Sequence, residues 1–137
     1  MKIKELQNSP IGVFDSGLGG LTVLKSLEKI LPNESFIYFG DTAHIPYGTK
    51  SADTVIKYSQ NILDFFIEQR TKAVVIACNT ASAVAYHALQ KNYSIPLFDV
   101  VSPSVEFALH ESQTKNVGVI GTTSTVSSKA YSRQFAE

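Results

Sequence analysis

Short apolar segments alternate with longer amphipathic stretches along most of this chain. Branched and aromatic side chains, which strands favour, are concentrated in four short segments, at residues 11–14, 35–39, 73–77 and 95–100. The segment at 73–77 is continuously apolar, which is typical of a parallel strand covered on both faces. A segment at 116–121 has the same character and predicts a fifth strand.

Apolar residues between these segments recur at three- and four-residue intervals, the spacing of one buried helix face. This pattern predicts helices at residues 18–31, 51–70, 80–91, 102–111 and 126–136. Ser51 is suited to cap the second of these helices, and Ser102 with Pro103 to begin the fourth. The regular alternation predicts the α/β class, with an open parallel sheet and helices on both faces.

Composition and charge exclude several classes of protein. The 137 residues include 44% hydrophobic and 18% charged side chains, which is enough apolar material for a buried core. The 12 basic and 12 acidic residues give a net charge of zero, without the basic excess of a general nucleic-acid binder. Apolar runs are far shorter than the roughly 20 residues that span a bilayer, and the first residues are too polar for a signal peptide. One cysteine cannot form an internal disulfide, so a cytoplasmic protein with neither membrane nor nucleic acid as partner is expected.

Polar, glycine-rich or reactive sequence follows four of the predicted strands. These strand ends read DSGLGG at residues 15–20, DTAHIPYG at 41–48, CNTAS at 78–82 and GTTST at 121–125. Ligands of parallel α/β sheets bind outside the carboxyl ends of the strands, where the fold brings such segments together. The sequence therefore predicts a binding or catalytic site along this edge.

The glycine-rich segment at 15–20 has several interpretations. Glycines before a helix let backbone N–H groups approach a phosphate or a carboxylate, so a phosphate- or nucleotide-binding module is one alternative. Thr22 stands where a dinucleotide-binding fingerprint needs its third glycine, and the Gly-Lys-Ser/Thr ending of a P-loop is absent. Asp41 falls where a ribose-binding acid would lie, which is a weak signal. A tight turn without any ligand is the remaining interpretation.

Cys78 is the only thiol of the chain. It falls between a buried strand and a helix, where the helix dipole would favour a thiolate and lower the pKa from its usual value of about 8.5. Asn79 and Thr80 add hydrogen-bonding side chains, and Asp15 is expected on a neighbouring strand end. A small core residue is the alternative, but this setting favours a thiol that acts as an acid, base or nucleophile.

The three histidines, His44, His87 and His110, are too far apart in sequence to indicate a metal site. Only His44 falls on the functional edge, as a candidate substrate contact or a solvated loop residue. A hydrolase or amidase with Cys78 as its nucleophile would need His44 as a general base near the sulfur. That class of enzyme remains an alternative.

Three of these motifs, at residues 15–20, 46–48 and 77–82, resemble those of the aspartate/glutamate racemase superfamily, in particular the N-terminal half of bacterial glutamate racemases. The resemblance extends from about Gly12 to the end of the chain. It implies a cofactor-independent racemase that interconverts L- and D-glutamate with two cysteines on opposite faces of the substrate and supplies D-glutamate for peptidoglycan synthesis. It also implies that the full-length protein is a homodimer.

The resemblance assigns roles to individual residues. It makes Cys78 one of the two proton donors and acceptors. It matches six residues to substrate contacts: Asp15, Ser16, Tyr47, Gly48, Asn79 and Thr80. The loop at 121–125 resembles a further contact region, with Thr122 and Thr125 as candidates. The resemblance implies neither a metal nor a cofactor.

One departure from the family changes the expectation for this chain. The second cysteine of the family lies in a Gly-Cys-Thr-His motif that these 137 residues lack. We therefore expect residues 1–101 to form a first lobe that lacks its C-terminal return segments, and 102–137 to begin a second lobe, with no activity alone. A truncated product, a fragment or a divergent one-cysteine relative would each fit. An aspartate or hydantoin racemase and a one-cysteine decarboxylase are the nearest alternatives in function.

Overall fold

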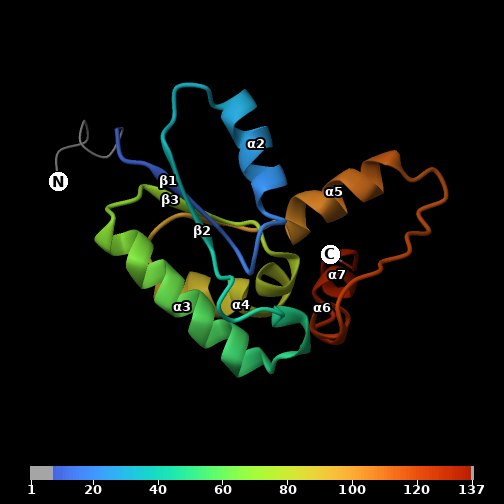
Figure 1. Cartoon of the computed structure of the whole chain (residues 1–137). Helices are drawn as coiled ribbons and strands as arrows, with labels where there is room; N and C mark the ends of the chain where they lie inside the picture. Colours follow the sequence, from blue (N-terminus) through green and yellow to red (C-terminus); the bar gives the residue numbers. More distant parts are fainter. Residues whose placement is uncertain (1–7, 137) are drawn as a thin grey trace.

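The computed structural model describes residues 8–136, which contain a four-stranded parallel sheet (Figure 1). Its strands are β1 (Ile11–Asp15), β2 (Phe36–Gly40), β3 (Ala73–Ile76) and β4 (Leu97–Phe98). They lie in the order β2-β1-β3-β4, and Val13 at the centre of β1 pairs with Tyr38 on one side and Val75 on the other. All four strands therefore end at the same edge, which we call the carboxyl edge.

The connections between the strands are helical, as the sequence predicts. The helical segments are α2 (Leu21–Ile30), the 3-10 turn η1 (Tyr47–Thr49), α3 (Ala52–Glu68), α4 (Asn79–Asn92), α5 (Val101–Glu111), α6 (Thr123–Ser127) and α7 (Ala130–Gln134). Ser51 caps α3 as expected, because its side chain accepts a hydrogen bond from the Thr54 N–H. The expected α/β fold is confirmed.

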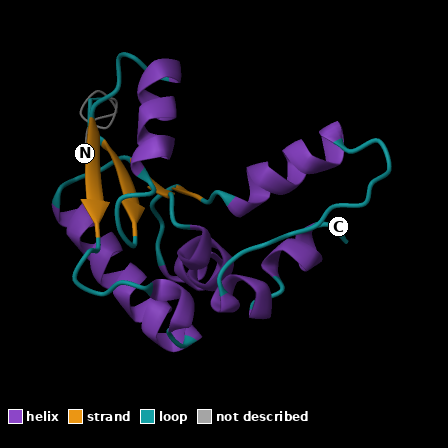
Figure 2. Cartoon of the chain, turned by 45° about the vertical axis from the view of Figure 1, so that its right-hand side comes forward, coloured by secondary structure: helices purple, strands orange, loops and turns teal. Residues whose placement is uncertain are grey.

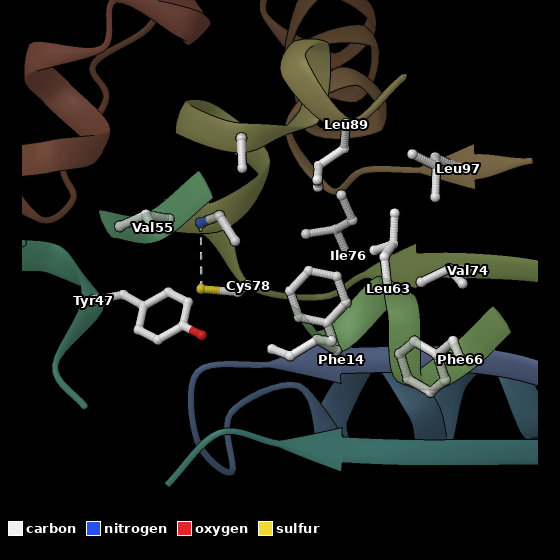
Figure 3. Close-up of a cluster of buried hydrophobic side chains, with 13 residues drawn as sticks. Phe14, Tyr47, Val55, Leu63, Phe66, Val74, Ile76, Cys78, Leu89 and Leu97 are labelled. Atoms are coloured by element: carbon white, nitrogen blue, oxygen red, sulfur yellow. Dashed lines mark hydrogen bonds between the residues drawn. The ribbon is translucent and has the colours of Figure 1, made fainter. Parts of the chain in front are cut away.

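The main core lies between one face of the sheet and the helices α3 and α4 (Figure 3). Its largest fully buried aliphatic and phenyl side chains are Phe14, Leu63, Phe66, Ile76 and Leu89. The Phe66 ring packs directly over Gly12, since a Cβ atom on that glycine would lie 2.7 Å from the ring. Van der Waals contact between α3 and β1 therefore requires glycine at position 12.

Replacing Phe66 with alanine should lower the free energy of unfolding by about 3–5 kcal/mol, since a buried ring is lost and a cavity remains. Urea denaturation followed by circular dichroism measures the change. Ile67→Ala is the matched control, because the neighbouring Ile67 side chain is 47% exposed and should matter far less. Equal losses in the two variants would contradict this packing.

The other face of the sheet is covered by α2, which lies opposite α3 (Figure 1). This cover is less complete, because no residue of α2 is fully buried. A groove of about 510 Å³ lies between Leu27 of α2, with Leu31 just after the helix, and Ile11, Val75 and Phe98 on the sheet side. Helices on both faces are thus confirmed, with one face much better packed than the other.

The fifth strand expected at residues 116–121 is wrong. This segment runs without regular structure between α5 and α6 (Figure 2), and no other strand within residues 8–136 pairs with it. Its Ile120 side chain is 99% exposed. Branched residues give a segment the propensity for a strand, but the hydrogen bonds must come from a neighbouring backbone.

Two expected boundaries near the end of the chain also change. β4 covers only two of the six residues expected, because Asp99 turns the chain into a helix by accepting hydrogen bonds from the N–H groups of Val101 and Ser102. The N-cap position of α5 is therefore Val100 and not Ser102, and the carboxylate of the preceding Asp99 binds the first N–H groups of the helix. The helix expected at 126–136 divides into α6 and α7 because Lys129 adopts a left-handed conformation, with φ of 56°.

None of the helices found between residues 8 and 136 combines the length and the apolar character that crossing a membrane requires.

Candidate functional site

Asp15, the last residue of β1, organises the glycine-rich loop that follows it. Its Oδ2 atom accepts hydrogen bonds from the N–H groups of Gly17 at 3.1 Å and Gly20 at 3.0 Å. Gly20 approaches the Asp15 side chain closely, since a Cβ atom there would lie 2.6 Å from the Asp15 Cβ. These N–H groups are therefore bound to a carboxylate of the chain itself, which leaves them unavailable to a phosphate.

Cys78 lies at the end of the segment that follows β3, and its side chain caps α4 (Figure 3). The Sγ atom accepts a hydrogen bond from the Ala81 N–H and donates one to Ser16 Oγ, both at 3.5 Å. Only 4% of the residue is exposed. The thiol is therefore held between the loop after β1 and the first turn of α4.

The helix terminus does not leave Cys78 with a lowered pKa. Burial raises the pKa of Cys78 above its ordinary value, and the nearby Asp15 charge raises it further. Hydrogen bonding with Ser16 and with the Ala81 N–H lowers the pKa but does not offset the burial. The cysteine therefore keeps its proton at neutral pH, because loss of water outweighs the favourable helix terminus.

Alkylation of Cys78 by iodoacetamide at pH 7 should be slower than that of an unstructured cysteine peptide, because the raised pKa leaves less thiolate and burial restricts access to the sulfur. The rate should rise as the pH passes well above the usual cysteine pKa of about 8.5. A mass-spectrometric time course measures both. The urea-unfolded chain is the control and should react like the peptide. Faster reaction of the folded chain would contradict the raised pKa.

Asp41, just after β2, holds the following loop in place through hydrogen bonds to His44 and Tyr47. The buried Asp41 carboxylate accepts a hydrogen bond from Tyr47 OH at 2.6 Å and pairs with His44 Nδ1 at 2.7 Å. Burial and the Asp41 hydrogen bond raise the pKa of Tyr47, so its hydroxyl stays a donor. The His44 ring stacks on Tyr58, with 4.1 Å between ring centroids. His44 therefore contacts Asp41 and Tyr58, whereas the thiol contacts Ser16 and Ala81. A hydrolase with Cys78 as its nucleophile would need His44 beside the sulfur, and this arrangement does not provide that contact.

A cluster of threonine hydroxyls joins α4 to the loop at 121–125. Thr80 Oγ1 lies 3.0 Å from Thr122 Oγ1 and 3.4 Å from Thr125 Oγ1, and the latter two are 2.9 Å apart. Ser124 Oγ donates a hydrogen bond to the Gly48 carbonyl at 2.9 Å. Four predicted residues therefore come together here: Gly48, Thr80, Thr122 and Thr125. They do so although the segment at 116–121, which precedes the last two, is not a strand.

Gly48→Ala should destabilise the chain by about 1–3 kcal/mol, the usual cost of overpacking. The added Cβ would lie 2.5 Å from Thr122 Cβ, so the loop at 121–125 would have to move. Thermal or urea unfolding measures the loss. Gly118→Ala is a matched control, because a Cβ there meets nothing within 4 Å. Similar stabilities for the two variants would contradict the close contact.

Asn79, the first residue of α4, lies beside a cavity of about 600 Å³ at the carboxyl edge. Asp15, Ala77, Ser104 and Phe107 also line this cavity. Asn79 Oδ1 accepts a hydrogen bond from Tyr131 OH at 2.6 Å. The cavity therefore adjoins the segment that contains Cys78 and offers carboxylate, amide and hydroxyl groups to a small polar ligand.

The nine predicted site residues all lie at the carboxyl edge, but they form four contact groups. Asp15 and Asn79 line the cavity, Ser16 contacts the Cys78 thiol, and the remaining ones surround the threonine cluster and the Asp41 network. Within the described part of the chain, no three His, Cys, Asp or Glu side chains are grouped as metal ligands would be.

Sequence reasoning missed Ser124 and Tyr131, which shape this edge, and considered Asp41 only as a ribose-binding acid and not as a partner of Tyr47. Asp41 carried a signal, because it directly follows a strand and precedes His44 and Tyr47 in one loop. Tyr131 carried none, since its partner Asn79 lies 52 positions away. Contacts at such separation depend on how the helices pack and not on local pattern.

Comparison with known proteins gives consistent results. A family model described as Asp/Glu/Hydantoin racemase matches residues 11–137. The glutamate racemase of Geobacter metallireducens is 53% identical over 123 residues, covering 90% of this chain and 46% of that protein. That of Thermoanaerobacter pseudethanolicus is 50% identical over 130 residues, covering 95% of this chain and 48% of the relative.

Solved structures show the same similarity. Glutamate racemase from Thermus thermophilus, in complex with β-chloro-D-alanine, matches with a TM-score of 0.86 and 50% identity, covering 93% of this chain and 48% of that one. The Francisella tularensis enzyme, in complex with D-glutamate, matches with a TM-score of 0.84 and 48% identity, covering 94% of this chain and 48% of that one. The chain thus spans about half the length of the relatives it matches.

Proposed function

The chain belongs to the Asp/Glu/hydantoin racemase family, and from this premise we propose that it forms one side of a glutamate racemase active site, with Cys78 as one of two proton-transferring groups. The observation that carries the proposal is the thiol at the start of α4, which contacts Ser16 and lies in the chain between Ala77 and Asn79, two residues that line the cavity. Relatives that are 44–53% identical are named glutamate racemases, which supports glutamate over aspartate or hydantoin.

Inversion of an amino acid needs a base on one face of the α-carbon and an acid on the other. In our proposal one thiolate removes the α-proton, and the electron pair of the broken C–H bond spreads onto the α-carboxylate. A thiol on the opposite face then delivers its proton to the α-carbon. The raised pKa of Cys78 makes the thiol its resting form, so it is set to donate first and act as the base in the reverse reaction.

The second proton-transferring group must come from outside these residues, because Cys78 is the only cysteine of the 137. We propose a second cysteine in the remaining half of a longer protein. We place the boundary between the two lobes near Val101, where α5 leaves the sheet. The two lobes would close around the substrate and exclude water, which strengthens the hydrogen bonds to the developing charge.

The proposed substrate contacts divide by chemistry. The Asn79 carboxamide, the Ser16 hydroxyl, the Gly48 backbone and the hydroxyls of Thr80, Thr122 and Thr125 can hydrogen-bond the carboxylate and ammonium groups of glutamate. Asp15 and the Tyr47 network keep these elements in place through their own hydrogen bonds. Proton transfer by thiols requires no cofactor and no metal ion. In the cell we propose a cytoplasmic homodimer that supplies D-glutamate for peptidoglycan synthesis.

A titration of the ¹⁵N-labelled chain tests the ligand. We expect D- and L-glutamate to shift the backbone amide signals of Gly48, Asn79 and Thr80, and aspartate to do so more weakly. ATP and inorganic phosphate are the controls for the nucleotide-binding alternative. Shifts of Gly17 and Gly20 with phosphate, without any response to glutamate, would favour that alternative and overturn our proposal.

A further inference from the structure

The hydrogen bond between Tyr131 and Asn79 connects two parts of the chain that lie far apart in sequence. Tyr131 belongs to α7, and Asn79 begins α4 directly after the Cys78 thiol. The Tyr131 hydroxyl donates to Asn79 Oδ1 at 2.6 Å. This contact involves the side chain to which the proposed function gives a role in binding substrate.

Tyr131 is held in place by its surroundings. The preceding residue, Ala130, is buried in a small core with Ala83, Val101 and Val105, and the Tyr131 ring packs against this core. On the next turn of α7, Gln134 Nε2 donates to Ser102 Oγ at 2.9 Å. The Tyr131 hydroxyl therefore reaches Asn79 from a helix that is fixed to both α4 and α5.

The direction of this hydrogen bond determines how the Asn79 amide lies. Burial raises the pKa of Tyr131, a hydrogen bond with Ser104 lowers it and the Asp99 charge raises it, with a net increase. The hydroxyl therefore remains a donor at neutral pH and requires an acceptor, which only the oxygen of a carboxamide provides. Once Oδ1 is bound to Tyr131, the NH₂ group of Asn79 is directed away from it and keeps both donors for another partner.

Asn79 is exposed and lines the cavity of about 600 Å³ at the carboxyl edge. An exposed asparagine without a fixed partner would present either its oxygen or its nitrogen to a ligand, since the two ends differ little in shape. A carboxylate can only accept hydrogen bonds. Selective binding of a carboxylate therefore benefits from a group that fixes the orientation of the amide.

We propose that Tyr131 is a positioning residue that holds the Asn79 carboxamide with its NH₂ group available to a carboxylate in this cavity. The identity of that carboxylate as part of glutamate rests on the proposed function. The orientation of Asn79 rests on the contacts of Tyr131 alone. The two statements can therefore be tested separately with the same 137-residue chain.

The first test follows the Asn79 side-chain NH₂ group by NMR relaxation in the ¹⁵N-labelled chain. Tyr131→Phe removes only the hydroxyl, so the amide should lose its fixed orientation and its order parameter should fall. Tyr86→Phe is the matched control, because the Tyr86 hydroxyl accepts an exposed hydrogen bond from Gln90 on the same helix, at 3.3 Å. An unchanged Asn79 order parameter in Tyr131→Phe would overturn the proposal.

The second test measures the dissociation constant for D-glutamate by titration. Loss of one hydrogen bond of ordinary strength should raise it about three- to tenfold in Tyr131→Phe and leave it unchanged in Tyr86→Phe. In an Asn79→Ala background, Tyr131→Phe should have no further effect, because Tyr131 acts through Asn79. A full additional loss in that background would show an independent role for Tyr131 and contradict the proposal.

Asn79→Asp separates the two roles, and its unfolding curve shows whether the fold is kept. Its carboxylate still accepts from Tyr131 but has no NH₂ group, so the chain should remain stable while glutamate binding is lost. If glutamate binds unchanged, the donor role of Asn79 is wrong. If glutamate fails to bind even the unmodified chain while Tyr131→Phe still frees the Asn79 amide, the glutamate assignment falls and the orientation by Tyr131 stands.

Discussion

Replacement of Cys78 by alanine or serine should lower the rate of glutamate racemisation by about 10²–10⁴-fold or more, the usual contribution of one acid–base group. The test uses a chimera in which this chain replaces the matching half of the Geobacter metallireducens glutamate racemase, to which it is 53% identical over 123 residues. Circular dichroism of D-glutamate solutions gives the rate. Serine keeps the size of the side chain, but its hydroxyl is a far weaker acid than a thiol, so it should not restore activity.

Ser59→Ala is the control for this first result. Ser59 is fully buried on α3, and its hydroxyl has no hydrogen-bond partner among the described residues, so its removal should leave the chimera active. Unfolding curves for the Cys78 variants show whether the fold survives. A Cys78→Ala chimera with full activity would contradict the role of the thiol in our proposal.

The second large effect concerns the chain by itself. We expect the 137 residues to give no measurable interconversion of D- and L-glutamate, because a single thiol can exchange the α-proton on one face only. The cavity beside Asn79 would also be open to water in the absence of a second lobe. Electrostatic stabilisation of the carbanion is much weaker at high dielectric, so even exchange should be slow.

Chiral chromatography and deuterium uptake separate these outcomes. Incubation of D-glutamate in deuterated water with the chain alone should yield no L-glutamate, and any deuterium at the α-carbon should appear with retained configuration. The unmodified chimera, at equal concentration, should yield deuterated product of both configurations. Rapid formation of L-glutamate by the chain alone would overturn the requirement for two thiols.

The parts of the fold that depend on local pattern could be predicted from the sequence. The strand at 73–77 and the helix at 51–70 agree with β3 and α3 to within two residues, because burial imposes a clear periodicity on both. The segment at 116–121 shows the limit of this approach. Its residues favour a strand, but a strand forms only where another backbone supplies hydrogen bonds.

The candidate site was predictable in position but not in its electrostatics. Strand ends converge by topology, so Asp15, Cys78 and Thr122 could be assigned to one edge before any distance was known. The acidity of Cys78 could not, since it depends on how completely the surrounding helices exclude water from the sulfur. For the same reason the hydrogen bonds of Asp41 and Tyr131 became visible only in three dimensions.

The three threonine hydroxyls at the carboxyl edge share a property that no single one has. Thr80, Thr122 and Thr125 form a closed ring, and each contributes one proton and can accept another. Such a ring has two senses of circulation, and rotation of the O–H bonds alone converts one into the other. A donor partner can be accepted by a spare oxygen lone pair with the ring intact, whereas an acceptor partner takes one of the three protons and opens one link of the ring, in both cases by rotation of O–H bonds alone. The ring can therefore act as an acceptor or, by giving up one internal hydrogen bond, as a donor, so the same three side chains could contact a group of either polarity.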